Sequence, residues 1–301
     1  MTADAQNQVA RRPSRTAQLM AVQRGLESAR PAQTRLFEDP LAGRFVSPAW
    51  RVALWGARFA VVRRVIEAIY DLVGGPGPRA SAIARTKLID DLIGEASPSI
   101  EQLVILGAGY DTRAHRLDCL SDRVVYEIDH PNTQTLKRTV LASAKASAAT
   151  APRYVAVDFE HDELTAALIA SGYQRTQRSM FLWEGVTQYL SSEAVDRTLS
   201  AIHRAARHGD TLVFTYVDEC VVRGEHDRFP EAARWLHGTA KRGEPWIFGF
   251  PPADLHDYLR THGFCLVSDL STRQAGERYF TPLGRPDRAS DLYHVATATV
   301  T

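Results

Sequence analysis

The chain has 301 residues, of which 45% are hydrophobic, so it can bury a full core and is neither disordered nor fibrous. Its 36 basic and 35 acidic side chains nearly cancel, and this overall charge indicates neither a nucleic-acid partner nor an anionic membrane surface. The three cysteines stand far apart without a CxxC pair, which argues against a disulfide framework and a structural zinc site. We therefore expect a small-molecule partner and no metal.

The first residues, MTADAQNQVARRPSRT, contain no apolar run like that of a signal peptide, and no stretch approaches the roughly 20 apolar residues of a membrane span. A cytoplasmic protein without a membrane partner is expected. We predict a disordered tail over 1–15, an N-terminal helical region over 16–80, and a cofactor-binding domain over 81–301 with a cap segment at about 219–250.

The N-terminal region contains one strongly periodic segment. Between residues 51 and 73, six apolar residues from Trp55 to Val73 follow one another at intervals of 4, 3, 4, 3 and 4, the period of a single helical stripe. This spacing predicts one amphipathic helix. The sequence GGPGP at 74–78 predicts its end, because glycine and proline both interrupt helices.

From there on, apolar strands alternate with helical stretches. Strands are expected at 102–106, 123–128, 153–157, 180–183, 211–216, 263–269 and 292–299, and helices notably at 131–148, 192–208 and 252–262. Such alternation, with nearly continuous apolar strands, is typical of a parallel sheet covered by helices on both faces. We predict an α/β fold with a doubly wound, mostly parallel seven-stranded sheet, whose last two strands form a hairpin-like edge.

The cap segment has charges and aromatic residues without a strand period. We expect it to pass over the strand ends, where open α/β sheets place their ligands. Its aromatic side chains, Trp235, Trp246, Phe248 and Phe250, would either line a cavity or pack the cap itself.

The most informative segment is LVILGAGYDTRAHRLDCLSDRVVYEID at 103–129. A strand runs into Gly107 and Gly109, and Asp129 follows 20 residues after Gly109, the pattern of a pocket in which bare backbone meets a nucleoside and a carboxylate binds the ribose. The third glycine of a dinucleotide site is replaced by Thr112, and Asp111 would repel a pyrophosphate. The pattern favours a nucleoside without phosphates over the cofactor of an NAD-dependent oxidoreductase.

Two more acids follow the next strands, Asp158 after the third and Glu184 after the fourth. Acids at the carboxyl ends of adjacent strands would line one crevice. Two simpler interpretations stay open: the glycines could form a simple tight turn, and Asp129 and Asp158 could be helix N-caps.

Several of these segments resemble the leucine carboxyl methyltransferase family. The resemblance rests on TRLFEDPLAGRFV at 34–46, ARTKLIDDLI at 84–93, QLVILGAGYDTRAHRL at 102–117, YEIDHP at 126–131, VAVDF at 155–159 and FLWEGVTQYL at 181–190. It is closer to the bacterial branch, the S-adenosylmethionine-dependent methyltransferases of actinobacteria, which include carboxyl methyltransferases of aromatic polyketide pathways. It covers roughly residues 30–220 in the family's order.

The resemblance implies a class I, Rossmann-like methyltransferase domain with S-adenosylmethionine as its cofactor. It implies that Arg85 pairs with the methionine carboxylate of the cofactor, although Arg85 could also be an ordinary helix-surface arginine. The backbone of Gly107, Ala108 and Gly109 would approach the cofactor. The other implied contacts are Asp129 with the ribose, Asp158 and Phe159 with the adenine, and Glu184 near the amino acid part.

The methyl acceptor is the least defined part of the prediction. The histidines are scattered and no base motif is evident. A carboxylic acid in water has a pKa near ~4 and needs no general base, whereas a phenol, with a pKa near ~10, would benefit from one. We therefore expect O-methylation of a carboxylate on a small metabolite such as an aromatic polyketide, with a phenolic hydroxyl as the alternative.

Three residues could orient that acceptor, although each could equally pack in the core or at the rim: Tyr189, Tyr216 and Arg223. An NAD-dependent oxidoreductase or a non-catalytic cofactor-binding protein remain distant alternatives. The sequence leaves the oligomeric state open.

Overall fold

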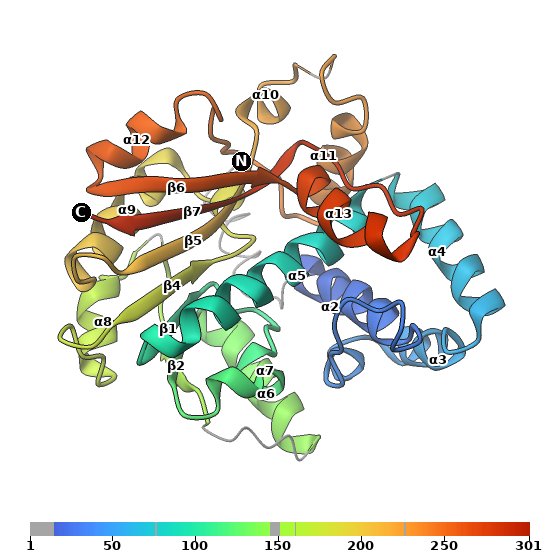
Figure 1. Cartoon of the computed structure of the whole chain (residues 1–301), viewed down its shortest axis with the longest axis horizontal. Helices are drawn as coiled ribbons and strands as arrows, with labels where there is room; N and C mark the ends of the chain where they lie inside the picture. The colour runs from blue at the N-terminus through green and yellow to red at the C-terminus, as the bar shows by residue number, and fades with distance from the viewer. Residues whose placement is uncertain (1–14, 76, 145–150, 160, 226) are drawn as a thin grey trace.

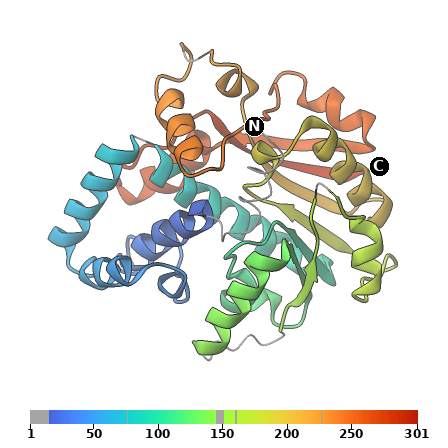
Figure 2. The same cartoon turned by 180° about the vertical axis from the view of Figure 1, so that it is seen from behind.

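The computed structural model describes residues 15–301 except for residues 76, 145–150, 160 and 226, so the tail expected over 1–15 lies, apart from Arg15, outside the described part. The described chain forms a seven-stranded sheet with helices on both faces (Figures 1 and 2). The strand order is β3-β2-β1-β4-β5-β7-β6. Strands β1 to β5 run parallel, whereas β7 is antiparallel to both of its neighbours. The doubly wound, mostly parallel seven-stranded sheet is confirmed.

The strands lie within two residues of their predicted positions. They are β1 (Gln102–Leu106), β2 (Val124–Asp129), β3 (Arg153–Ala156), β4 (Ser179–Trp183), β5 (Thr211–Val217), β6 (Phe264–Ser271) and β7 (Tyr293–Val300). The two closing strands pair antiparallel as expected, but they are joined through helix α13, and β7 inserts between β5 and β6. Of these two strands, β6 alone lies at an edge of the sheet; β3 forms the opposite edge.

The main helices surround this sheet. They are α2 (Arg15–Ser28), α3 (Pro48–Gly56), α4 (Ala60–Gly74), α5 (Pro78–Ala96), α6 (Arg113–Arg116), α7 (Pro131–Ser143), α8 (Leu164–Ala170), α9 (Ser192–Ala205), α10 (Glu219–Val222), α11 (Ala232–Lys241), α12 (Leu255–Thr261) and α13 (Thr272–Phe280). The end of the helix expected over 131–148 falls outside the described residues. Among the described residues, no helix combines the length and the apolar character that crossing a membrane requires.

Both faces of the sheet are buried, because successive side chains of a strand point to opposite sides. In β1, Val104 and Leu106 pack in the core layer that contains α8, α9 and α12. Leu103 and Ile105 pack in the layer that contains α5 and α13. Since helices cover both faces, a ligand has access to the sheet only at the strand ends.

The single helix expected over 51–73 is instead two helices, α3 and α4. Gly56 ends α3, and Phe59 has extended backbone (φ −84°, ψ 125°) just before α4. The buried Arg63 donates a hydrogen bond from Nη1 to the carbonyl oxygen of Ala57, 3.3 Å away, which satisfies a backbone acceptor in the turn. The apolar residues keep the same spacing on both sides of the break, so the sequence pattern does not reveal it.

The apolar stripe of this segment does not face the core. Trp55, Phe59 and Val73 are 62%, 61% and 76% exposed. Leu54 and Ala57, off this stripe, are buried in a core cluster with α2, and of the stripe residues Ile66 is half-buried and packs against the same cluster. Figures 1 and 2 both show α2, α3 and α4 together at one side of the sheet.

The segment after α11 is fixed to the end of β5 by a close backbone approach. Phe250 and Val217 join through a hydrogen bond of 3.1 Å from the Phe250 N–H to the Val217 carbonyl oxygen. A Cβ atom at Gly249 would lie 2.7 Å from Glu219 Cα and 2.8 Å from Val217 O, so only glycine fits there. This contact holds the cap segment over the strand ends.

Replacing Gly249 by alanine should destabilise the protein by about 1–3 kcal/mol, because the new methyl group meets backbone that cannot move aside. Gly94 is the matched control: it lies in the exposed part of α5, and a Cβ there meets nothing within 4 Å. Gly94→Ala should stabilise the protein by about 0.5–1 kcal/mol through helix propensity. Urea unfolding of both variants measures the difference; equal free energies of unfolding would contradict the close approach.

Candidate functional site

A cavity of about 1400 Å³ lies at the carboxyl ends of β1, β2 and β4. Its turn end is formed by the residues that follow these strands and β3, among them Gly107, Gly109, Asp129, Asp158 and Phe159. Its helical end is formed by α2, α4, α11 and the segment after α11, among them Leu19, Ile66, Tyr70, Arg242 and Trp246. Usual ligand pockets measure about 300–1,000 Å³, so this cavity has room for two molecules side by side.

The glycines of the turn after β1 are required by its geometry. Gly107 and Gly109 have φ angles of +65° and +46°, in the region that disfavours other residues. A Cβ atom at Gly107 would lie 2.2 Å from Val186 Cγ2. The N–H of Ala108 donates to the carbonyl oxygen of Ile128 at 2.9 Å and ties the turn to β2. The turn therefore presents its backbone to the cavity.

Asp129 ends β2 and lines the same end of the cavity. Its Oδ1 accepts a hydrogen bond of 2.6 Å from the His130 N–H, and its Oδ2 accepts one from the Gly109 N–H. Burial raises the pKa of this carboxyl, and the two N–H donors limit the rise. Asp129 does not cap α7, since the His130 ring accepts from the Asn132 N–H. Each carboxylate oxygen keeps capacity for one more donor, such as a hydroxyl.

Asp158 and Phe159 line the turn end from the segment after β3. The Asp158 N–H donates to Asp162 Oδ2 at 2.8 Å, which fixes the turn. Asp158 is not a helix cap either, because the Glu163 carboxylate accepts from the Ala166 N–H at the start of α8. Phe159 is half-buried and packs against the core below the cavity.

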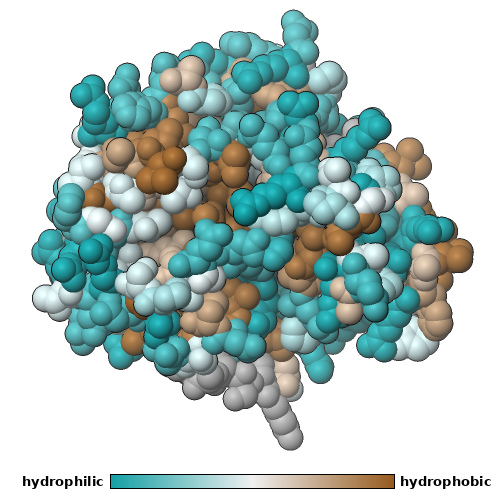
Figure 3. Space-filling view, viewed as in Figure 1, coloured by the Kyte–Doolittle hydropathy of each residue, from teal (hydrophilic) through white to brown (hydrophobic). Residues whose placement is uncertain are grey.

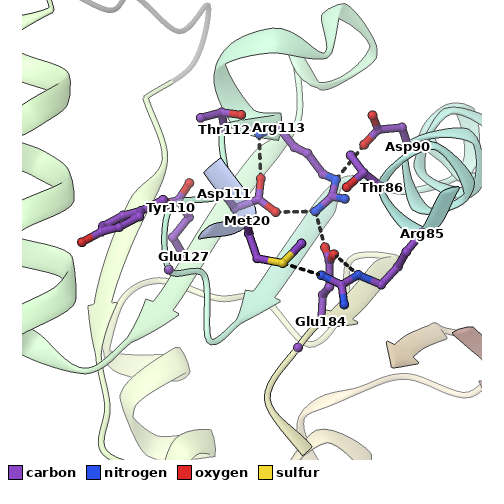
Figure 4. Close-up of polar contacts among 12 residues, drawn as sticks. Met20, Arg85, Thr86, Asp90, Tyr110, Asp111, Thr112, Arg113, Glu127 and Glu184 are labelled. Atoms are coloured by element: carbon purple, nitrogen blue, oxygen red, sulfur yellow. Dashed lines mark hydrogen bonds and ion pairs between the residues drawn. The ribbon is translucent and has the colours of Figure 1, made fainter. Parts of the chain in front are cut away.

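A buried ion network joins three elements beside the turn (Figure 4). Glu184 Oε1 lies 2.7 Å from Arg85 Nε, and Glu184 Oε2 lies 2.7 Å from Arg113 Nη1. Arg113 Nε also contacts Asp90 Oδ1 at 2.7 Å, and Arg113 Nη1 contacts Asp111. Asp90 pairs further with Arg116, so three arginines and three acids balance one another.

The network keeps Glu184 and Asp111 ionised. Burial alone would raise the pKa of the Glu184 carboxyl, but Arg113 and Arg85 hold it below its usual value. The pKa of the Asp111 carboxyl is likewise lowered, against the effect of burial, mainly by Arg113. Acids of this kind are poor proton acceptors near neutral pH.

Arg85 lies between the network and the open part of the cavity. Its Cζ lies 4.9 Å above the ring of Tyr293, and its Nη2 lies 3.7 Å from Met20 Sδ. Glu184 is the one carboxylate that pairs with it in the part of the chain that the structure describes. Arg85 is therefore an inward-facing cavity residue rather than a helix-surface arginine.

Other residues of the site carried no recognisable signal in the sequence. Asp111 was expected only to repel a pyrophosphate; its Oδ1 accepts from the Arg113 N–H at 2.7 Å, and it belongs to the ion network centred on Arg113. Glu244 accepts from the Thr16 N–H at 3.0 Å and so satisfies the first turn of α2. This contact joins residues 228 positions apart, and Tyr293 meets Arg85 across a similar separation.

Of the three residues expected to orient an acceptor, one lines the cavity. Tyr189 is half-buried at the helical end, and burial raises the pKa of its phenol. Tyr216 is wholly buried in the core, where its hydroxyl donates to Asp269 Oδ2 at 2.6 Å. Arg223 is exposed and pairs with Glu219 at 2.7 Å. The structure therefore does not bring Tyr216 or Arg223 to the cavity, and Tyr189 alone of the three remains a candidate for orienting an acceptor.

The helical end combines aromatic walls with unpaired cations. Trp235 and Trp246 line it, whereas Phe248 and Phe250 pack in the core, so both interpretations of the cap aromatics hold in part. Three of the cations that line it lie on α11 or directly after it: Arg234, Lys241 and Arg242. Among the described residues no carboxylate forms an ion pair with any of the three. The helical end is thus an apolar chamber with excess positive charge.

Solved structures share this architecture. A crystal structure of a candidate methyltransferase from Thermobifida fusca superposes with a TM-score of 0.56 at 18% identity and covers 92% of this chain and 97% of that one. A DUF574 family protein from Streptomyces avermitilis gives a TM-score of 0.56 at 14% identity, over 92% of this chain and all of the other. At these identities the likeness shows the fold, which is that of a class I methyltransferase.

Sequence comparisons show the family. A candidate S-adenosyl-L-methionine-dependent methyltransferase of Frankia alni is 33% identical over 277 residues, which are 90% of this chain and 88% of the relative. Another, from Mycolicibacterium vanbaalenii, is 33% identical over 223 residues, 71% of each chain. The family model described as leucine carboxyl methyltransferase matches residues 17–203. The chain therefore belongs to the leucine carboxyl methyltransferase family.

Proposed function

We propose that this protein is an S-adenosylmethionine-dependent methyltransferase that methylates a carboxylate of a small apolar molecule. Membership of the family, and relatives that are named for this cofactor, support the methyltransferase activity with S-adenosylmethionine. The unpaired cations Arg234, Lys241 and Arg242 at the helical end of the cavity support a carboxylate as the methyl acceptor.

The residues at the turn end fit a nucleoside that has no phosphates. The backbone at Gly107 and Gly109 is bare, and Asp129 can accept from ribose hydroxyls. The arginines Arg113 and Arg116 are neutralised by their acidic partners, so they offer no excess charge to a pyrophosphate. Asp158 and Phe159 would hold the adenine by a hydrogen bond and an apolar contact.

Arg85 and Glu184 would bind the amino acid part of the cofactor. A guanidinium is the natural partner of a carboxylate, and Glu184 holds Arg85 through its Nε. When bound, the cofactor supplies a methyl group on a positively charged sulfonium. Glu184 orients Arg85, and each of its oxygens, which accepts one arginine hydrogen bond, keeps capacity for one more donor.

The helical end would bind an anionic acceptor. The apolar walls exclude water, which strengthens the attraction between a cation and a carboxylate. If one carboxylate oxygen pairs with Lys241 or Arg242, the other remains free as the nucleophile. A carboxylate is already ionised at neutral pH, so the protein has only to align it with the methyl group. Tyr189 lies at this end and can donate a hydrogen bond to an acceptor.

Asp129→Ala should weaken the binding of S-adenosylhomocysteine by about 1–3 kcal/mol, because the charged hydrogen bonds to the ribose are lost. Isothermal titration calorimetry measures this affinity. Asp122→Ala is the control, since its carboxylate is exposed and pairs only with Arg123 among the described residues. An unchanged affinity for Asp129→Ala, or heat of binding from NAD instead, would contradict the assignment.

The rate of methyl transfer at saturating substrate should be flat between about pH 6 and 9. The pKa values of Glu184 and Asp111 are lowered, so both acids stay ionised above about pH 6. Burial raises the pKa of Tyr189, so its phenol stays neutral. A carboxylate acceptor is also ionised throughout. A steep rise across this range would instead indicate a phenolic acceptor that must lose a proton.

The double variant Lys241→Gln/Arg242→Gln should raise KM for an aromatic carboxylic acid by about tenfold to a hundredfold, since the acceptor loses one charge-assisted hydrogen bond, which contributes about 1.5–3 kcal/mol. Affinity for S-adenosylhomocysteine should not change, because that ligand occupies the turn end. Arg223→Gln is the matched control from the same cap segment, outside the cavity. Transfer of a radiolabelled methyl group to a panel of such acids provides the readout; an equal effect of Arg223→Gln would count against the proposal.

A further inference from the structure

The outer surface of α3 and α4 is unusually apolar. Of the thirteen large hydrophobic side chains that are exposed in the described residues, nine belong to these two helices and the turn between them. We call this surface the outer apolar face; it includes Trp55, Phe59, Val61, Val65, Leu72 and Val73, each at least 53% exposed. Figure 3 shows hydrophobic side chains gathered at the right edge of the molecule, where Figure 1 places α4. Contiguous apolar surface of this kind marks a site of interaction.

The outer apolar face is continuous with the cavity. Ile69 and Val73 both line the cavity, yet they are 56% and 76% exposed. Ile66 and Tyr70, on the neighbouring side of α4, lie deeper and also line it. The cavity therefore opens within the apolar face, and an apolar molecule can pass from one to the other without crossing polar surface at α4.

The exposed charges of these helices and of the turn between them that have no ion-pair partner among the described residues are all positive. Arg51, Arg58 and Arg64 are exposed. The two acids of these helices are turned to partners: Glu67 lies 2.6 Å from Arg30, and Asp71 lies 2.9 Å from Arg79. A twofold dimer through this face would bring surfaces with the same excess positive charge together, which is unfavourable. Aromatic and aliphatic residues bordered by arginine are instead typical of helices that lie in the interface of an anionic membrane.

We propose that the outer apolar face docks this protein on an anionic lipid bilayer, and that the acceptor enters the cavity from the bilayer beside Ile69 and Val73. The second half of this inference rests on the proposed function, whereas the docking does not. The near-zero net charge of the whole chain led us to expect no membrane partner, but that average conceals the local charge of α3 and α4. The bilayer would cover the apolar side chains and supply the acceptor at high local concentration.

Flotation of the purified full-length protein with lipid vesicles tests the docking. Vesicles of 70% phosphatidylcholine and 30% phosphatidylglycerol should bind the protein about a hundredfold more tightly than pure phosphatidylcholine, because three arginines act near the charged surface. High salt should remove most of this preference. Trp55→Ser/Phe59→Ser should abolish flotation, whereas Val267→Ser, an exposed apolar residue on β6 that is 61% exposed, should leave it unchanged.

Two further measurements show whether the bilayer contacts this face and whether the cofactor site is independent of it. Lipids brominated in the acyl chains should quench tryptophan fluorescence, and Trp55→Phe should remove most of that quenching while it keeps flotation. Neither Trp55 nor Phe59 lines the cavity, so S-adenosylhomocysteine should bind their double variant as it binds the original protein. If neither the original protein nor the double variant binds S-adenosylhomocysteine, the proposed function is contradicted, whereas the result on membrane docking is unaffected.

Three outcomes would overturn the docking. One is that the protein floats neither with the anionic vesicles nor with the vesicles of pure phosphatidylcholine. Another is flotation that survives the double variant. The third is a dimer in sedimentation experiments that Trp55→Ser/Phe59→Ser converts to a monomer, since the face would then be an interface between copies of this chain.

Discussion

The buried contact between Arg113 and its three acidic neighbours is the interaction on which the site depends. It joins the turn after β1, the end of β4 and helix α5, each of which supplies one acid. Buried charges are tolerated only when they are paired and hydrogen-bonded, so none of these elements can shift without leaving a charge uncompensated. The position of Arg85 follows from this arrangement through Glu184. A geometry that could bind a cofactor is thus fixed by the fold before any ligand arrives.

Much of the fold and of the turn end could be predicted because the signals are local. Short apolar runs such as 103–106 specify buried parallel strands, and the positive φ of Gly107 explains a glycine that the sequence alone already marked. Periodicity was a weaker guide. It predicted helix between 51 and 73 but gave neither the break at 57–59 nor the outward direction of the stripe, since a helix has the same period whichever side is buried.

The helical end could not be predicted, because its walls come from distant parts of the chain. Tyr216 and Arg223 stand near the end of β5 in sequence, but Tyr216 is buried because both faces of β5 are covered, and Arg223, which follows the short helix α10, is exposed. Conversely, nothing local marks Lys241 or Arg242 as cavity residues. Their role arises only when α11 is placed opposite α4 by the backbone contact at Gly249.

The hydrogen bond between Thr16 and Glu244 also has a consequence for the order in which the protein assembles. The two residues are 228 positions apart, and Tyr293, which covers Arg85, follows later still. At a synthesis rate of about 5–20 residues per second, α2 leaves the ribosome tens of seconds before its partner exists. In that interval the strands β1 to β4 can pair, and the buried side chains of α2 already have their packing partners, the last of which is Leu141. What must wait is the part of the cavity wall that Glu244 and Tyr293 supply, so closure of the cavity is among the last events of biosynthesis.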